Sequence, residues 1–187
     1  MTTNADIAGK TTWQLDPAHT LIEFSAKHMM ITTVKGRLAD VKGTIWVDET
    51  DPSGSRVEVE MGAASADTRV QDRDDHLRSA DFLDVETYPT ITFRSTRIEG
   101  AHAEAGDSFR VIGGLTIRGT TREIVVDATF EGTGKDPWGG ERASFSGTTK
   151  IDRRDFGLTW NQALETGGVL VSNELRISLE VQAVKGS

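Results

Sequence analysis

The stretch DRDDHLRS, residues 72–79, gathers acids, arginines and a histidine in a mixture typical of a metal site or a catalytic centre. Asp72 and His76 are four residues apart and share one face if the segment is helical, a spacing that suits metal coordination. The sequence identifies no third ligand nearby. The remaining histidines could approach only through folding that the sequence does not reveal, and they are His19, His28 and His102.

The same charges also fit a structural role at a helix terminus. Asp72, Asp74 and Asp75 favour the N-terminal end of a short helix, where carboxylates complement the helix dipole. Arg73 and Arg78 can then pair with carboxylates or with loop carbonyls. We predict this capping and ion-pair network for the segment, and no metal site.

Motifs that support catalysis are missing from the chain. It has no cysteine, which excludes disulfides, thiolate metal ligands and a cysteine nucleophile. It also has no G-x-S-x-G nucleophile elbow, no P-loop, no dinucleotide-binding glycine fingerprint and no H-E-x-x-H. We therefore predict no catalytic residue, no cofactor and a protein that is not an enzyme.

Length, charge and hydropathy limit the partners of the protein. The chain has 187 residues, the size of one domain, and can bury a substantial core without a disulfide or a metal. Its formal net charge of −8 argues against nucleic acid and anionic membrane surfaces. The chain contains no run of eighteen apolar residues, so no membrane span is predicted. Residues 1–14 lack the apolar run of a signal peptide. The sequence predicts a cytoplasmic protein with a neutral or apolar partner.

Alternation of apolar and polar residues dominates the sequence. Ile22 and Phe24 share one face of residues 20–28 while Glu23 and Ser25 share the other, which is the two-residue period of a half-buried strand. The same period predicts eight strands, over residues 20–28, 41–49, 56–65, 90–98, 108–119, 121–132, 141–152 and 174–184.

A sheet with one apolar face must cover that face. With almost no helix available, it closes into a barrel or folds into a sandwich. Only residues 70–84 break the period, because Val70 and Leu77 fall on helical spacing and Asp72 or Asp74 could start a helix. We predict an all-β fold with one short helical insertion between its third and fourth strands, and no second domain.

Five segments, in order, give the chain a specific resemblance to a known family. They are WQLDPAHTLIEFSAKH (13–28), VKGRLADVKGTI (34–45), DRDDHLRSADFLDVETYPTITFRST (72–96), VIGGLTIRGTTREI (111–124) and IDRRDFGL (151–158), followed by the final amphipathic strand. The chain resembles the YceI-like family, bacterial proteins with a lipocalin-like barrel that bind polyisoprenoid lipids. The resemblance covers nearly the whole chain, so we divide it into an N-terminal tail (1–11) and one YceI-like barrel domain (12–187).

The resemblance implies an eight-stranded antiparallel barrel around an elongated apolar cavity. Such a cavity holds a long isoprenoid chain, either a polyprenyl or a quinone-like lipid, which the protein sequesters or carries in transport. Relatives often form dimers, so the partners implied are an isoprenoid or other apolar lipid and a second copy in a homodimer. Many relatives are periplasmic or secreted, unlike the cytoplasmic location that this sequence predicts.

Strand alternation and the resemblance together predict the residues that contact the ligand. Apolar cavity residues are Ile22, Phe24, Ala26, Ile45, Val47, Val59, Met61, Phe82, Leu83, Ile91, Phe93, Val111, Gly113, Leu115, Ile117, Val126, Ala128, Phe130, Phe145, Ile177 and Leu179. Small residues among them leave room along the axis, so Phe at Ala128 or Gly113 is predicted to exclude lipid. Candidate contacts to a head group are His28, Arg78 and Tyr88. For His28 a hydrogen bond to neighbouring strands, which fixes the barrel mouth, is the alternative that the sequence slightly favours.

Other interpretations stay open from the sequence alone. One is an enzyme acting on a lipophilic substrate with His28 or His76 as acid–base; another is a stress or interaction protein whose barrel is filled by its own side chains. Residues 152–170 form a long connection with four large apolar residues, and we expect it either to line the cavity mouth or to contact a second copy. Trp138 is predicted to shield a barrel edge.

Overall fold

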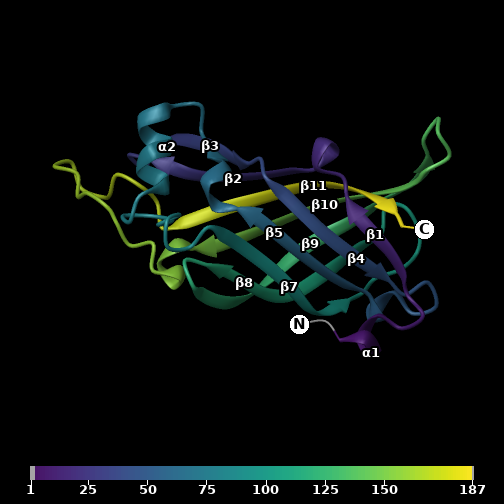
Figure 1. The fold of residues 1–187 in the computed structure, drawn as a ribbon. Helices are drawn as coiled ribbons and strands as arrows, with labels where there is room; N and C mark the ends of the chain where they lie inside the picture. Colours follow the sequence, from purple (N-terminus) through teal and green to yellow (C-terminus); the bar gives the residue numbers. More distant parts are fainter. Residues whose placement is uncertain (1–2, 187) are drawn as a thin grey trace.

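The structure, a computed structural model, describes residues 3–186 and consists mainly of antiparallel strands (Figure 1). The strands are β1 (Thr11–Leu15), β2 (Leu21–His28), β3 (Thr32–Leu38), β4 (Val41–Val47), β5 (Arg56–Gly62), β6 (Ala66–Asp67), β7 (Thr90–Glu99), β8 (Ser108–Ile117), β9 (Thr120–Lys135), β10 (Glu141–Asp152) and β11 (Glu174–Lys185). The helices are short: α1 (Asn4–Ile7), η1 (Pro17–His19), η2 (Pro52–Gly54), η3 (Ala63–Ser65), α2 (Gln71–Arg78) and η4 (Arg153–Phe156).

Eight of these strands close into a barrel. The order β1-β4-β5-β7-β8-β9-β10-β11 returns to β1 through an antiparallel β1–β11 pairing. This confirms the predicted antiparallel barrel and its one short helical insertion between β5 and β7, and it excludes the open sandwich. Closure matters because it leaves every strand of the ring paired on both sides.

The remaining strands extend the wall at one end of the barrel. β1 and β2 follow one another along the same edge of β11, where Leu15 pairs with Ala183 and Ile22 pairs with Leu179. β3 continues into β4 after two residues, and β6 pairs with β3 beyond the end of β5. Three of the eight positions around the wall are therefore each occupied by two strands in succession. These pairs are β1 with β2, β3 with β4, and β5 with β6.

Three strands were missing from the sequence prediction, namely β1, β3 and the two-residue β6. Each is short, and β3 has only Val34 and Leu38 as apolar residues on its inward face, on either side of Gly36. Gly36 is required there because Phe24 on β2 pairs with it, and a Cβ at Gly36 would collide with the Phe24 ring. An aromatic ring covering a strand glycine is a known way to fix register. The pattern was too sparse to find from alternation alone.

The predicted N-terminal tail, residues 1–11, contains α1, and β1 begins at its last residue, Thr11. Residues 1, 2 and 187 lie outside the described part of the chain. Within the described part, residues 3–186, no helix has both the length and the apolar character that a membrane crossing requires.

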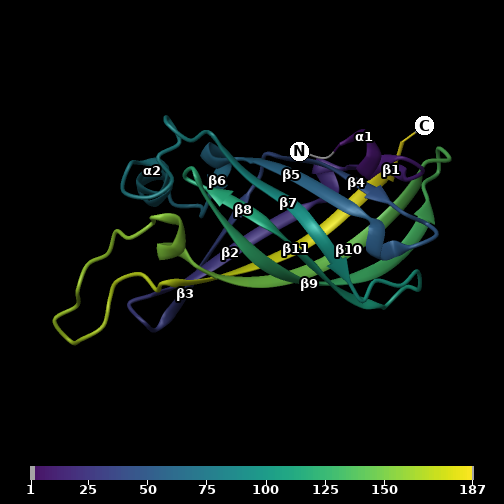
Figure 2. The ribbon, with the colours of Figure 1, turned by 90° about the horizontal axis from the view of Figure 1, so that it is seen from below.

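The insertion between β5 and β7 covers one end of the barrel, and Figures 1 and 2 both place α2 there. Arg78 holds the helix down, because its Nε donates to the Ala64 carbonyl (2.8 Å) and its Nη2 to the Ala66 carbonyl (3.1 Å). The buried carboxylate of Asp74 accepts from both the amide (2.8 Å) and the hydroxyl (2.6 Å) of Thr68. The Arg78 bonds confirm its predicted pairing with loop carbonyls, whereas the Asp74 carboxylate bonds to Thr68 and not to an arginine.

The helix itself differs from the prediction in its bounds. It begins at Gln71 after Val70, whose side chain makes no cap, so neither Asp72 nor Asp74 starts it. The reason is that the Asp74 carboxylate bonds back to Thr68, outside the helix, instead of capping the helix from its first position. The helical spacing predicted as far as Asp84 ends at Arg78.

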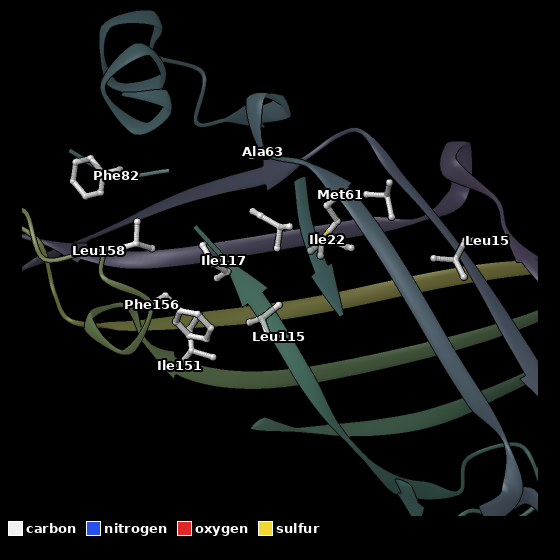
Figure 3. Close-up of a cluster of buried hydrophobic side chains, with 12 residues drawn as sticks. Leu15, Ile22, Met61, Ala63, Phe82, Leu115, Ile117, Ile151, Phe156 and Leu158 are labelled. Carbon is white, nitrogen blue, oxygen red and sulfur yellow. The ribbon is translucent and has the colours of Figure 1, made fainter. Parts of the chain in front are cut away.

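The apolar core lies inside the barrel. Figure 3 shows part of the largest buried cluster, in which Phe82, Phe156 and Leu158 gather near the α2 end and Leu15 lies far toward the other end. Between them Ile22 from β2, Met61 from β5, and Leu115 and Ile117 from β8 project inward. The cluster follows the barrel axis and does not form one compact centre.

The bend between β1 and β2 carries an ionic contact with a testable pH dependence. Asp16 accepts from His19 Nδ1 (2.8 Å) and Arg142 Nη1 (2.7 Å), and these hydrogen bonds lower the pKa of its carboxyl from 3.8 to about 2. Since the folded-state pKa lies below the unfolded one, the stabilisation is complete above the unfolded pKa and is lost as the pH falls through the folded pKa.

We expect Asp16→Asn to lower the free energy of unfolding by up to about 2 kcal/mol near neutral pH. The difference from the unmodified protein should shrink between about pH 4 and pH 2, where the carboxylate becomes protonated. Urea unfolding midpoints measured across this range check the expectation. A difference that stays constant down to pH 2 would show that the Asp16 charge does not stabilise the bend.

Candidate functional site

The barrel encloses one long cavity of about 810 Å³, which we call the tunnel. It extends from His76 and Trp160 at the α2 end to Glu49 and His102 at the opposite end. The 12-residue strands β10 and β11 rise about 3.3 Å per residue and tilt by about 40°, which gives a barrel roughly 30 Å tall. The barrel is therefore not filled by its own side chains, although eight strands leave room for only a slender ligand.

The predicted apolar residues lie along this tunnel with a single exception. Those that line it are Ile22, Phe24, Ala26, Ile45, Val47, Val59, Met61, Phe82, Leu83, Ile91, Phe93, Val111, Leu115, Ile117, Val126, Ala128, Phe130, Phe145, Ile177 and Leu179. They come from β2, β4, β5, β7, β8, β9, β10 and β11 and from the insertion after α2. The lining is aliphatic and aromatic over most of its length.

Gly113 is the exception, and its position corrects the prediction. It is not among the residues that line the tunnel. A Cβ at Gly113 would collide with the backbone of Arg94 and Ser95 on β7, where the β7–β8 register shifts between Ser95 and Arg97. The glycine permits a close approach of two strands at this bulge, so a larger residue would break the wall before it reached the tunnel.

The candidate head-group residues separate into two groups. His28 lines the tunnel at the α2 end and forms an isolated antiparallel bridge with Val171. Arg78 and Tyr88 do not line it. The Arg78 guanidinium is occupied by loop carbonyls, and the Tyr88 ring packs where a Cβ at Gly119 would stand. Of the three, the geometry leaves His28 as the one that can meet a ligand in the tunnel.

An aromatic cluster closes the α2 end of the tunnel. The His76 ring meets the Trp160 ring edge-on with centroids 4.6 Å apart, and meets Phe82 in the same way at 5.0 Å. His76 Nε2 also lies 2.9 Å from a carboxylate oxygen of Asp81. The histidine considered as a metal ligand is thus packed between two rings. Across residues 3–186, no group of three or more histidine and acidic side chains is arranged to hold a metal ion.

Arg153 fixes the long connection between β10 and β11 against this cluster. Its side chain is 2% exposed. Its guanidinium donates to the carbonyls of Leu158 (2.6 Å) and Trp160 (2.8 Å) on one limb of the connection. It also donates to the carbonyls of Ser172 (2.9 Å) and Val171 (3.3 Å) on the other limb.

Among the described residues, 3–186, no carboxylate lies within 4.0 Å of the Arg153 guanidinium, and burial lowers the pKa of this group below its usual value. The cation lies over the Phe82 ring, 6.0 Å from the centroid, and borders the tunnel. Four carbonyl dipoles and an aromatic face thus stabilise this buried cation, together with the charge of Asp152 at longer range.

The two ends of the tunnel differ in chemistry from its middle. At the α2 end Arg73 and Arg153 border the lumen, while Asp48 and Glu49 border it at the other end. The middle is lined by Val59, Phe93, Val126, Ile177 and similar residues. Such an arrangement can solvate an apolar chain along its length and leaves polar contacts to the ends.

The chain is similar to known proteins over most of its length. The sequence profile of the YceI-like domain matches residues 13–183, most of the chain. The protein belongs to the YceI-like family. A UPF0312 protein of Pseudomonas aeruginosa strain LESB58 is 39% identical to this YceI-like chain over 162 residues, which cover 87% of this chain and 81% of the relative.

Solved structures share the YceI-like fold. The crystal structure of Burkholderia cenocepacia BcnA matches with a TM-score of 0.77 at 23% identity, over 90% of this chain and 98% of that one. A polyisoprenoid-binding domain from Saccharophagus degradans, implicated in plant cell wall breakdown, matches with a TM-score of 0.69 at 12% identity. That match covers 93% of this chain and 98% of the other. At these identities the likeness shows the common fold.

Several residues of this YceI-like tunnel were missing from the sequence prediction. Leu158, Trp160 and Leu170 from the connection after β10 border it, which is the mouth-lining alternative for residues 152–170. Their apolar character was visible in the sequence, but their position was not. Trp13 and Leu15 also line it, and they were missed together with β1. Trp138, by contrast, is 88% exposed and shields no barrel edge.

Proposed function

We propose that the protein binds a long apolar isoprenoid lipid, polyprenyl or quinone-like, inside the tunnel. The observation that carries the proposal is the continuous cavity of about 810 Å³, which has an apolar lining from His76 and Trp160 to the far end. Ligand pockets commonly measure about 300–1,000 Å³, so this cavity has the size of a ligand site. The Saccharophagus domain, described as polyisoprenoid-binding, supports the class of ligand by analogy.

Burial provides the binding energy in this proposal. Each Å² of apolar ligand surface that leaves water for the tunnel contributes about 25 cal/mol, and a preformed wall adds little ordering cost. Tunnel length then selects the length of the chain. Polar groups at the ends, such as His28 and Arg73, select the head group. The ligand-contact roles of the tunnel residues are part of this proposal.

We infer binding and not turnover. The tunnel wall offers a reacting group mainly aliphatic and aromatic contacts. Of the two histidines at the α2 end, His76 packs between two rings beside Asp81, and we assign the His28 imidazole to head-group contact, since its bridge to Val171 is formed by the backbone. Storage, transport or protection of the lipid, a homodimeric state and a cytoplasmic location stay predictions.

The proposal predicts that organic extraction of the purified protein releases an isoprenoid lipid, identified by mass spectrometry. Delipidated protein should rebind the same lipid at close to one molecule per chain. A chemically altered isoprenoid after incubation would support the enzyme alternative instead. Failure both to recover lipid and to load the delipidated protein with a long isoprenoid would contradict the proposal.

A further inference from the structure

Three consecutive apolar side chains are exposed at the tip of the β2–β3 hairpin. Met29 is 44% exposed, Met30 57% and Ile31 78%. The turn is closed by the Ile31 amide, which donates to the His28 carbonyl (3.1 Å). Both residues inside the turn have positive φ, 51° at Met29 and 64° at Met30. This is the type I′ arrangement, which normally takes Asn-Gly because other residues are strained there. Local folding therefore disfavours the two methionines that the chain places at this turn.

The tip is held in place although its side chains are left exposed. The Met29 amide donates to the Leu170 carbonyl (2.8 Å), and the Ser172 amide donates to the Lys27 carbonyl (3.0 Å). Lys27, the nearest cation in sequence, bonds to the Thr33 hydroxyl (2.8 Å). The connection after β10 thus supports the hairpin from one side, and the three apolar side chains project from a fixed platform.

The tip also lies beside the α2 end of the tunnel. Ala26, His28 and Val34, from the two strands of this same hairpin, line the tunnel, as does Leu170 of the supporting connection. Figures 1 and 2 place the β2–β3 hairpin, α2 and the connection after β10 at one end of the barrel. The β9–β10 hairpin, which carries Trp138, lies at the opposite end.

Area and charge decide what kind of partner fits the tip. Three protruding side chains offer apolar surface on the order of 300 Å², whereas a stable protein interface needs about 800 Å² from each partner. A second copy of the chain is therefore a poor fit. Residues 29–34 contain no charged side chain, and the whole chain carries −8, so an anionic surface gains nothing here. A neutral lipid interface accepts isolated apolar side chains without a matching surface.

We propose that the Met29–Ile31 tip inserts into the interface of a zwitterionic lipid bilayer, and so docks the tunnel mouth on the membrane. A lipid leaving the tunnel would then pass between two apolar environments without crossing water. The purpose of docking rests on the proposed lipid binding, but docking itself needs no ligand in the tunnel.

The test is co-sedimentation of the full chain with phosphatidylcholine vesicles that contain no isoprenoid. The informative variant combines Met29→Asn, Met30→Gly and Ile31→Ser, because Asn-Gly suits the positive φ values and should preserve the fold. We expect the unmodified protein to partition onto the vesicles and the triple variant to lose at least about tenfold in partitioning. Replacing part of the phosphatidylcholine with phosphatidylglycerol should not strengthen binding.

Trp138→Ser is the matched control, since Trp138 is more exposed than any residue of the tip but lies at the other end of the barrel. It should leave partitioning unchanged. Several results would overturn the proposal: no binding by the unmodified protein, equal binding by the triple variant, loss of binding in Trp138→Ser, or binding that depends on anionic lipid. If the unmodified protein is a dimer and the triple variant is a monomer, the tip binds a second copy of the chain instead. Isoprenoid loading of the delipidated triple variant, measured separately, tells a failure of docking from a failure of lipid binding.

Discussion

Substituting phenylalanine for Ala128 is expected to remove the isoprenoid lipid from the purified protein while leaving the barrel folded. Ala128 lies on β9 and lines the tunnel, between its register partners Phe109 on β8 and Gly147 on β10. The Ala128 methyl borders the lumen, and the space that a Cβ at Gly147 would need is already bordered by Val126 and Leu179. A ring added there extends across a barrel that is only just wide enough for one slender ligand.

The fold should tolerate this ring better than a filled core would. Overpacking a dense core costs about 1–3 kcal/mol, and here the ring enters existing space, so we expect a cost near the lower end. The measurement is the ratio of extracted lipid to protein, together with the thermal midpoint. Loading of delipidated protein with added isoprenoid should fall by at least about tenfold, since the chain would have to displace a packed ring.

Val125→Phe provides the control on the same strand. Val125 is 42% exposed and does not line the tunnel, so the variant adds the same ring to β9 without narrowing the lumen. Its lipid ratio should equal that of the unmodified protein. If the Ala128 variant keeps both its fold and its full lipid load, the ligand does not occupy the middle of the tunnel.

The inward faces of the strands were predictable because alternation depends only on neighbours in sequence. Once Ile22 or Val126 is assigned to a strand, its side follows from the two-residue period, and the structure places both in the tunnel wall. Gly113 shows the limit of this reasoning. Its collision with Arg94 depends on a register shift in β7, which is set by pairing between strands. No local pattern in residues 108–119 reports it.

Side-chain contacts at the α2 end could not be predicted from the sequence for a similar reason. Arg153 and Arg154 are adjacent and identical in type, yet one is buried against four carbonyls and the other pairs with Asp152 in solvent. The turn η4 decides between them, because it directs one side chain inward and the next outward. His76 was visible in the sequence as a chemical group, but its ring partner Trp160 is 84 residues away and is brought there only by folding.

Substituting methionine for Arg153 is expected to detach the connection after β10 and open the α2 end of the tunnel. Methionine keeps much of the length and apolar character of the side chain but donates no hydrogen bond. The carbonyls of Leu158, Trp160, Val171 and Ser172 would lose the donor that joins the two limbs. Each buried group left without a partner costs about 1–3 kcal/mol, although opening of the connection lets water reach some of them.

We expect the free energy of unfolding to fall by about 3 kcal/mol or more, and the thermal midpoint to fall by roughly 10 °C for a chain of this size. Hydrogen exchange of the amides in residues 157–173 should rise before exchange in the barrel strands does, because the connection opens locally. Release of bound lipid should also become faster, since Leu158 and Trp160 border the tunnel.

Arg154→Met separates this mechanism from a simple loss of positive charge. Arg154 pairs with Asp152 at 2.6 Å in a solvent-exposed position, so its removal takes the same charge from the next residue in the chain. Exposed ion pairs contribute little to stability, and we expect no measurable change in midpoint, exchange or lipid release. The thermal midpoint and the lipid-release rate of Arg153→Lys should lie between those of the two methionine variants, because one ammonium group cannot reach both limbs of the connection. If Arg153→Met and Arg154→Met behave alike, Arg153 acts through its charge alone and does not hold the tunnel closed.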